Sequence, residues 1–145
     1  MSKLLITATI VMALTGCVTP PNVHQIRNDV AFQKSYDFVW ERIVYVFARN
    51  NIAVKNIAKD SGVIFAERAA FDDSLADCGK PGMFFPISRR VQLNVFVNRS
   101  GKDPVVSINT EFIEMRRFMN SPPEPFICTS RGVIENTILN EIDKN

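Results

Sequence analysis

The sequence predicts an α+β fold: a single domain in which an antiparallel sheet of four to five strands carries two helices on one face. Two segments repeat apolar residues every three to four positions, which is the period of an amphipathic helix. The segments between them alternate apolar and polar residues, as half-buried strands do. The length of 145 residues suits one domain. The predicted element order is strand, helix, four strands, helix (β-α-β4-α).

The first predicted elements are a short strand over residues 29–34 and a helix over residues 36–49. Ser35 is the predicted N-cap, and Asp37 lies in the first turn, where a carboxylate favours the helix dipole. Asn50-Asn51 end the helix. Its apolar stripe is Tyr36, Val39, Trp40, Ile43, Val44 and Phe47.

Four strands follow as two predicted hairpins. Residues 52–57 and 63–70 flank a Lys-Asp-Ser-Gly turn, in which Asp and Ser bond to the local backbone and Gly tolerates a positive φ. Residues 90–97 and 106–118 alternate apolar and polar side chains on either side of a second turn. We therefore expect this longer hairpin to have one buried and one solvated face.

Two connections are predicted to be irregular, and a helix follows the second. Residues 71–89 form a long loop that contains Gly and Pro, and residues 120–126 form a proline-rich loop. Thr129 or Ser130 is the predicted cap of the last helix. Its apolar stripe is Val133, Ile134, Ile138, Leu139 and Ile142.

The start of the chain predicts a lipid anchor. Residues 1–16 read as a signal peptide, with Lys3 before an apolar run that is too short to span a bilayer. The following Leu14-Thr15-Gly16-Cys17 resembles the lipobox of bacterial lipoproteins. The resemblance implies cleavage before Cys17 and acylation of its thiol and its new amine, which anchors a protein stably. An ordinary signal peptide is the alternative.

The residue after Cys17 predicts the compartment. Val18 stands where lipoproteins retained in the inner membrane typically carry Asp, so we expect an outer-membrane lipoprotein with its domain in the periplasm. The lipidated Cys and residues up to 28 are interpreted as an extended tether in which His24 is exposed, because Pro20-Pro21 favour extended backbone. The globular domain then spans residues 29–145.

Composition and motifs argue against an enzyme and against a nucleic-acid binder. The formal net charge of +2 is too small for a basic nucleic-acid surface. The chain has one His, in the predicted tether, and no Gly-x-Ser-x-Gly or phosphate-binding Gly loop. We expect no catalytic residue, no cofactor and no metal. The acidic side chains interpreted as ordinary surface charge are Glu67, Asp72, Asp73, Asp77, Glu111 and Glu114.

Cys78 and Cys128 remain once Cys17 is assigned to the lipid. A compartment beyond the inner membrane is oxidising, so we expect the two to form a disulfide. A free catalytic thiol and a metal pair are the alternatives. Catalysis by a thiol needs a base, and a zinc site needs about four ligands, which the His and Cys content does not supply.

The lipobox, the short tether and the segment SYDFVWERIVYVFARNNIAVKNIAKDSGVIFAER together resemble small proteobacterial outer-membrane lipoproteins. The element order over residues 29–142 is similar to the β-α-β4-α domains of BamC-like lipoproteins, which belong to the outer-membrane β-barrel assembly machine. The resemblance implies a binding or scaffolding module whose partner is an envelope protein or complex.

The predicted contact surface lies where the disulfide brings the two irregular loops together. Aromatic and Met side chains on loops held by a rigid frame are typical of protein contact surfaces. In the alternative interpretation the Phe side chains fold back and cap the core. A third hypothesis is a lipid or small apolar ligand between helices and sheet. The predicted partner-binding residues are Met83, Phe84, Phe85, Arg116, Arg117, Phe118 and Phe126.

Overall fold

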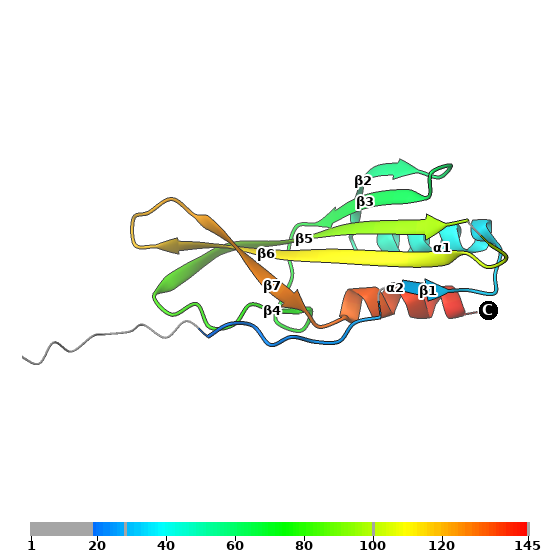
Figure 1. The fold of residues 1–145 in the computed structure, drawn as a ribbon. Helices are drawn as coiled ribbons and strands as arrows, with labels where there is room; N and C mark the ends of the chain where they lie inside the picture. Colours follow the sequence, from blue (N-terminus) through cyan, green and yellow to red (C-terminus); the bar gives the residue numbers. More distant parts are fainter. Residues whose placement is uncertain (1–18, 28, 100, 145) are drawn as a thin grey trace, which may run out of the picture.

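The computed structural model describes residues 19–27, 29–99 and 101–144, and it confirms the α+β class (Figure 1). The predicted signal peptide and Cys17 lie outside the described residues. The elements are β1 (Asp29–Ala31), α1 (Tyr36–Arg49), β2 (Ala53–Ala58), β3 (Val63–Arg68), β4 (Ala76–Asp77), β5 (Phe84–Asn98), β6 (Val105–Phe118), β7 (Glu124–Ser130) and α2 (Val133–Asp143).

The described residues form one antiparallel sheet of seven strands, so the predicted four to five was wrong. The order is β2-β3-β5-β6-β7-β4, and β1 pairs with β6. The two additional strands are β4 and β7, which lie in or after the segments predicted to be irregular. β4 has only two residues, and β7 begins in a proline-rich stretch. Neither segment carries the alternation of apolar and polar residues by which strands are identified.

Helix α1 has the predicted bounds and the predicted cap. The Phe38 N–H donates to the Ser35 side-chain oxygen at 3.2 Å. Helix α2 begins later than predicted, because Thr129 and Ser130 belong to β7. Its N-cap is Gly132, at φ 76°, a left-handed conformation that favours glycine.

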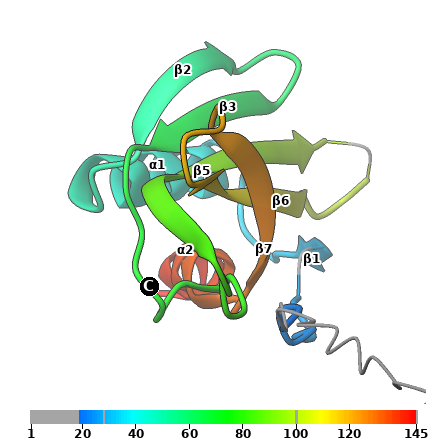
Figure 2. The same ribbon diagram turned by 90° about the vertical axis from the view of Figure 1, so that its left-hand side faces the viewer.

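Both helices pack on one face of the sheet and form a single core with it. Figure 2 shows the sheet curving around α1 and α2. Large apolar side chains of each helix are buried, as are those of β5 and β6 that face them. The main contributors are Val39, Ile43, Phe47, Val91, Leu93, Val95, Ile108, Phe112, Ile138 and Ile142.

Strands β5 and β6 are much longer than the helices that cover them. α1 has 14 residues, or about 21 Å, whereas the 15 residues of β5 extend over about 50 Å. β3 pairs with β5 only from Val91 onward. The remainder, residues 84–90, 112–118 and 124–128, is a three-stranded extension past the helices, which we call the arm (Figure 1).

The two outer strands of the arm each carry a proline. Pro86 lies in the part of β5 before its pairing with β3, and Pro125 lies in β7, which pairs with β4 only through its last two residues. Proline has no N–H to donate and is confined to edge strands, where it opposes the addition of another strand. The arm therefore offers side chains, more than backbone, to other molecules.

The predicted tether lies against the domain. Thr19 forms a β-bridge with Lys80, whose N–H donates to the Thr19 carbonyl at 3.2 Å. The backbone N–H and the side-chain amide of Asn22 donate to Asp77 Oδ2 at 3.2 and 3.1 Å. His24 was expected to be exposed and is half-buried. Residues 19–27 are thus a docked segment and not a free linker.

Glycine at position 79 permits this docking. Gly79 has φ 63°, and a Cβ built there would lie 2.1 Å from the Thr19 carbonyl oxygen. A side chain at this position would push the docked segment off the domain. This role of Gly79 was not predicted.

Candidate functional site

The predicted disulfide between Cys78 and Cys128 is present, and it links the segment after β4 to strand β7 of the arm. Cys78 directly follows β4, and Cys128 lies in β7 rather than next to the last helix. Both residues are buried. Since the two sulfur atoms are bonded to each other, neither is a free thiol or a metal ligand here. The disulfide holds residues 76–81 beneath the arm.

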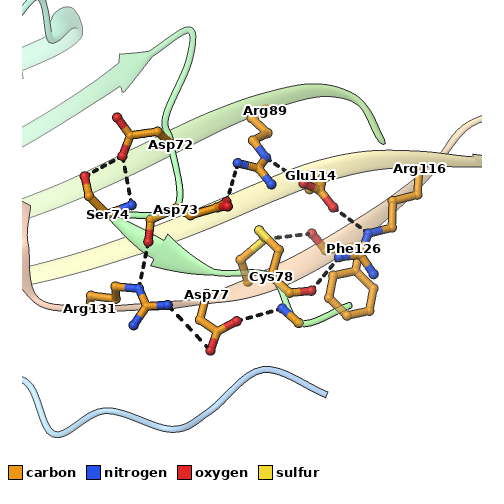
Figure 3. A network of polar contacts seen from close by, with 12 residues as sticks. Asp72, Asp73, Ser74, Asp77, Cys78, Arg89, Glu114, Arg116, Phe126 and Arg131 are labelled. Atoms are coloured by element: carbon orange, nitrogen blue, oxygen red, sulfur yellow. Dashed lines mark hydrogen bonds and ion pairs between the residues drawn. A yellow bond between two sulfur atoms is a disulfide. The ribbon is translucent and has the colours of Figure 1, made fainter. Parts of the chain in front are cut away.

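A buried ion cluster fills the arm's inner face where the helices no longer cover it (Figure 3). Glu114 is 1% exposed and lies between two arginines. Its Oε2 accepts from Arg89 Nε at 2.5 Å, and its Oε1 accepts from Arg116 Nε at 2.5 Å. Arg89 also bonds to Asp73 at 2.7 Å. Glu114 was interpreted as surface charge, and that interpretation was wrong.

Arg116 was expected to rim a contact surface, but it is 4% exposed. Besides Glu114, its guanidinium donates to the Cys78 carbonyl oxygen. Its Cζ lies 3.7 Å from the centre of the Phe126 ring, a cation–π distance (Figure 3). Arg116 of β6 thus contacts β7 through Phe126 and residues 76–81 through the Cys78 carbonyl. In this structure it stabilises the arm and is not a surface residue.

A second set of polar contacts joins the docked segment to the same region. Arg131 donates to the Asp73 carbonyl at 2.8 Å and lies 3.8 Å from Asp77 (Figure 3). Hydrogen bonds from the backbone N–H groups of Gly79 and Asn22 lower the pKa of Asp77 below its ordinary value. The ionised carboxylate therefore holds residue 22 at neutral pH, and this hold is lost only as the pH falls through the lowered pKa.

The remaining predicted partner-binding residues all lie on the arm or next to it. Met83 is in the turn before β5, and Phe84, Phe85, Arg117, Phe118 and Phe126 are on strands and not on loops. Phe84 of β5 is opposite Phe118 of β6, and Phe85 is opposite Arg117. Strand pairing, and not the disulfide alone, brings these residues together. This corrects the expectation that residues 71–89 and 120–126 are irregular throughout.

The strand geometry divides these residues into two groups, because successive side chains point to opposite faces. The inner group is Phe84, Arg116, Phe118 and Phe126, in which the rings of Phe84 and Phe118 are 5.6 Å apart. A groove of about 180 Å³ runs along it, lined by Phe84, Arg116, Glu124, Pro125 and Phe126. The exposed group includes Met83 and Phe85, each 62% exposed, and Arg117.

Two exposed apolar residues of the arm, Ile87 and Ile127, were not predicted, whereas Met119 belongs to the predicted cluster of aromatic and Met side chains. Ile87 lies at a register shift between Pro86 and Ser88, which interrupts the alternation that sequence analysis depends on. Met119 has φ 45°, a left-handed conformation that is uncommon for residues other than glycine. Met119 is also 70% exposed.

The space between helices and sheet bears on the apolar-ligand hypothesis. A cavity of about 80 Å³ lies there, lined by residues that include Val46, Ile52, Leu75 and Ile134. Pockets that hold drug-sized or cofactor-sized ligands measure roughly 300–1,000 Å³. The core side chains fill the region where an acyl chain was hypothesised to lie, so no observation favours that function.

The acidic residues of the long connection each have their own partners. Asp72 accepts hydrogen bonds from Ser74, Asp73 pairs with Arg89, and Asp77 bonds to Asn22. Across residues 19–27, 29–99 and 101–144, no three His, Cys, Asp or Glu side chains gather as a metal site would require. Within the same residues, no helix is both long enough and apolar enough to span a membrane.

Comparisons with protein families and with curated proteins give no relative. The chain matches no protein-family model and no curated protein.

Proposed function

We propose that this chain is a membrane-anchored envelope lipoprotein that acts as a non-enzymatic interaction module. A lipid on Cys17 holds the domain at the outer membrane, on the periplasmic side, and the arm contacts an envelope protein or protein complex. The lipobox and the resemblance to BamC-like lipoprotein domains support the anchor and the class of partner. In this proposal the domain is a scaffold and binds neither cofactor nor nucleic acid.

The single observation that carries the proposal is the arm. It extends past both helices, its outer strands carry prolines, and apolar side chains are exposed around its end. Exposed apolar patches on a rigid frame mark interaction sites. The buried Glu114–Arg116 ion pair and the disulfide hold the strands of the arm in place. The groove beside Phe84 therefore has a defined shape.

A photo-crosslinking amino acid in place of Phe84 tests the proposal in intact cells. Phe84 lines the groove and is 36% exposed, and a matched control is Phe96, which is 42% exposed and lies outside the arm, on the face of β5 opposite its buried side chains. We expect a discrete adduct with an envelope protein from position 84 and no such adduct from position 96. The proposal fails if position 84 yields no adduct, or if both positions yield the same products.

A further inference from the structure

The docked segment, residues 19–27, determines which part of the domain lies next to a lipid anchor on Cys17. Thr19 is held by the bridge to Lys80 and by the close approach of Gly79, and Asn22 is held by Asp77. Only Val18 separates Thr19 from Cys17. Two residues span at most about 7 Å, so the anchor cannot be far from Lys80.

The exposed apolar residues at the arm's end are close to that point. Lys80 is followed by a tight turn, in which the Phe84 N–H donates to the Pro81 carbonyl at 3.1 Å. Met83 lies in this turn and Phe85 follows it. The neighbouring turn after β6 holds Met119, where the Ser121 N–H donates to the Phe118 carbonyl at 2.9 Å. We call Met83, Phe85 and Met119 the tip.

The chemistry of the tip suits a phospholipid surface. Met83, Phe85 and Met119 are 62%, 62% and 70% exposed, and Lys80 and Arg117 are exposed beside them. Apolar side chains flanked by cations bind to the boundary between headgroups and acyl chains, where the cations meet lipid phosphates.

We infer that the tip contacts the phospholipid surface that carries the anchor. The domain is then oriented with the end of its arm against the membrane. This inference rests on the proposed lipid at Cys17 and adds an orientation and a second membrane contact. The opposite end of β5, about 50 Å away, then faces the periplasm, with Lys102 in the turn beyond it. The inner groove beside Phe84 stays available to a protein partner near the membrane.

Fluorescence quenching by nitroxide lipids tests the orientation. The full mature chain, purified with its acyl groups, is placed in vesicles of phosphatidylethanolamine and phosphatidylglycerol. A fluorophore is attached to Met83→Cys or, as the matched control, to Lys102→Cys. We expect the probe at 83 to lose most of its fluorescence and the probe at 102 to keep nearly all of it.

The other outcomes overturn the inference in distinguishable ways. If the acylated chain floats with the vesicles and neither probe is quenched, the tip does not touch lipid. If both are quenched, the domain lies flat. If the chain carries no acyl mass and does not float, the proposed anchor itself is wrong. A photo-crosslinker at Met83 that captures a protein but no lipid in cells also contradicts the inference.

A variant that releases the docked segment tests whether docking sets the orientation. Asp77→Ala removes the acceptor that holds Asn22, whereas Asp60→Ala changes a carboxylate in the exposed turn between β2 and β3. We expect Asp77→Ala to reduce quenching at position 83 several-fold, because the released segment lets the domain reorient, and Asp60→Ala to leave it unchanged. Equal quenching in both variants would show that docking does not set the orientation.

Discussion

Replacing Glu114 by Gln is expected to destabilise the domain by about 3–5 kcal/mol, the range observed when one partner of a buried ion pair is removed. The amide has nearly the same shape but carries no charge, so the guanidinium of Arg116, 4% exposed, loses its counter-ion. Arg89 keeps Asp73 as a partner. Chemical denaturation of the two proteins measures the difference in free energy of unfolding.

Glu111→Gln is the matched control, because Glu111 lies in the same strand but is exposed. Surface substitutions change stability by no more than about 0.5 kcal/mol. A loss below about 1 kcal/mol for Glu114→Gln would mean that the ion cluster does not support the arm. Combining Glu114→Gln with Arg116→Met should recover much of the loss, since no buried charge at residue 116 then lacks a partner.

Removing the disulfide with Cys78→Ala and Cys128→Ala is expected to lower the free energy of unfolding by about 4 kcal/mol. The two cysteines are 50 residues apart, and the chain-entropy argument gives this value for a loop of that length. Such a loss is a large share of the roughly 5–15 kcal/mol that stabilises a typical domain. Hydrogen exchange should increase most in residues 76–81, which the disulfide fastens beneath the arm.

Reduction of the native protein provides the control for the disulfide prediction. Once the disulfide is reduced, the native protein should unfold at nearly the same denaturant concentration as the double variant, and the reductant should not affect the double variant. If the double variant is as stable as the oxidised native protein, strand pairing alone supports the arm and the account of the disulfide is wrong.

The helical part of the fold follows directly from the sequence. Helix α1 has a strong apolar period, a serine cap and asparagines at its end, and its predicted bounds are confirmed. Its buried face differs slightly from the predicted stripe, because Val46 is buried while Tyr36 and Val44 are half-buried. Local signals suffice here because helix hydrogen bonds join residues that are close in the sequence.

Only the middle strand of the arm was predicted, and the two outer strands were missed because strand pairing joins residues distant in the sequence. The stretch Phe84–Arg89 contains a proline and a register shift, so it lacks the alternation that marks a strand. The segment before Cys128 contains Pro125 and was interpreted as a loop. Both segments become strands because β6 lies between them and pairs with each.

The candidate site was predicted in part. The disulfide was predicted from the oxidising compartment and the number of cysteines, and six aromatic and Met residues of the arm and its turns were identified by residue type. The buried role of Arg116 was not: strand alternation places Glu114 and Arg116 on one face, but nothing in the sequence shows that residues 76–81 cover that face. The docking of residues 19–27 was also missed, because it depends on contacts with Asp77 and Gly79 more than 50 residues away.

The most direct test of the account is the mass of the N-terminal peptide of the mature chain, isolated from membranes of cells that express the natural sequence. We predict a peptide that begins at Cys17 and carries acyl groups, and a Cys17→Ser variant that lacks them and is released from the membrane. An N-terminal peptide that begins elsewhere, or a Cys17 that carries no lipid, would contradict the central claim that this domain is held to the membrane by a lipid.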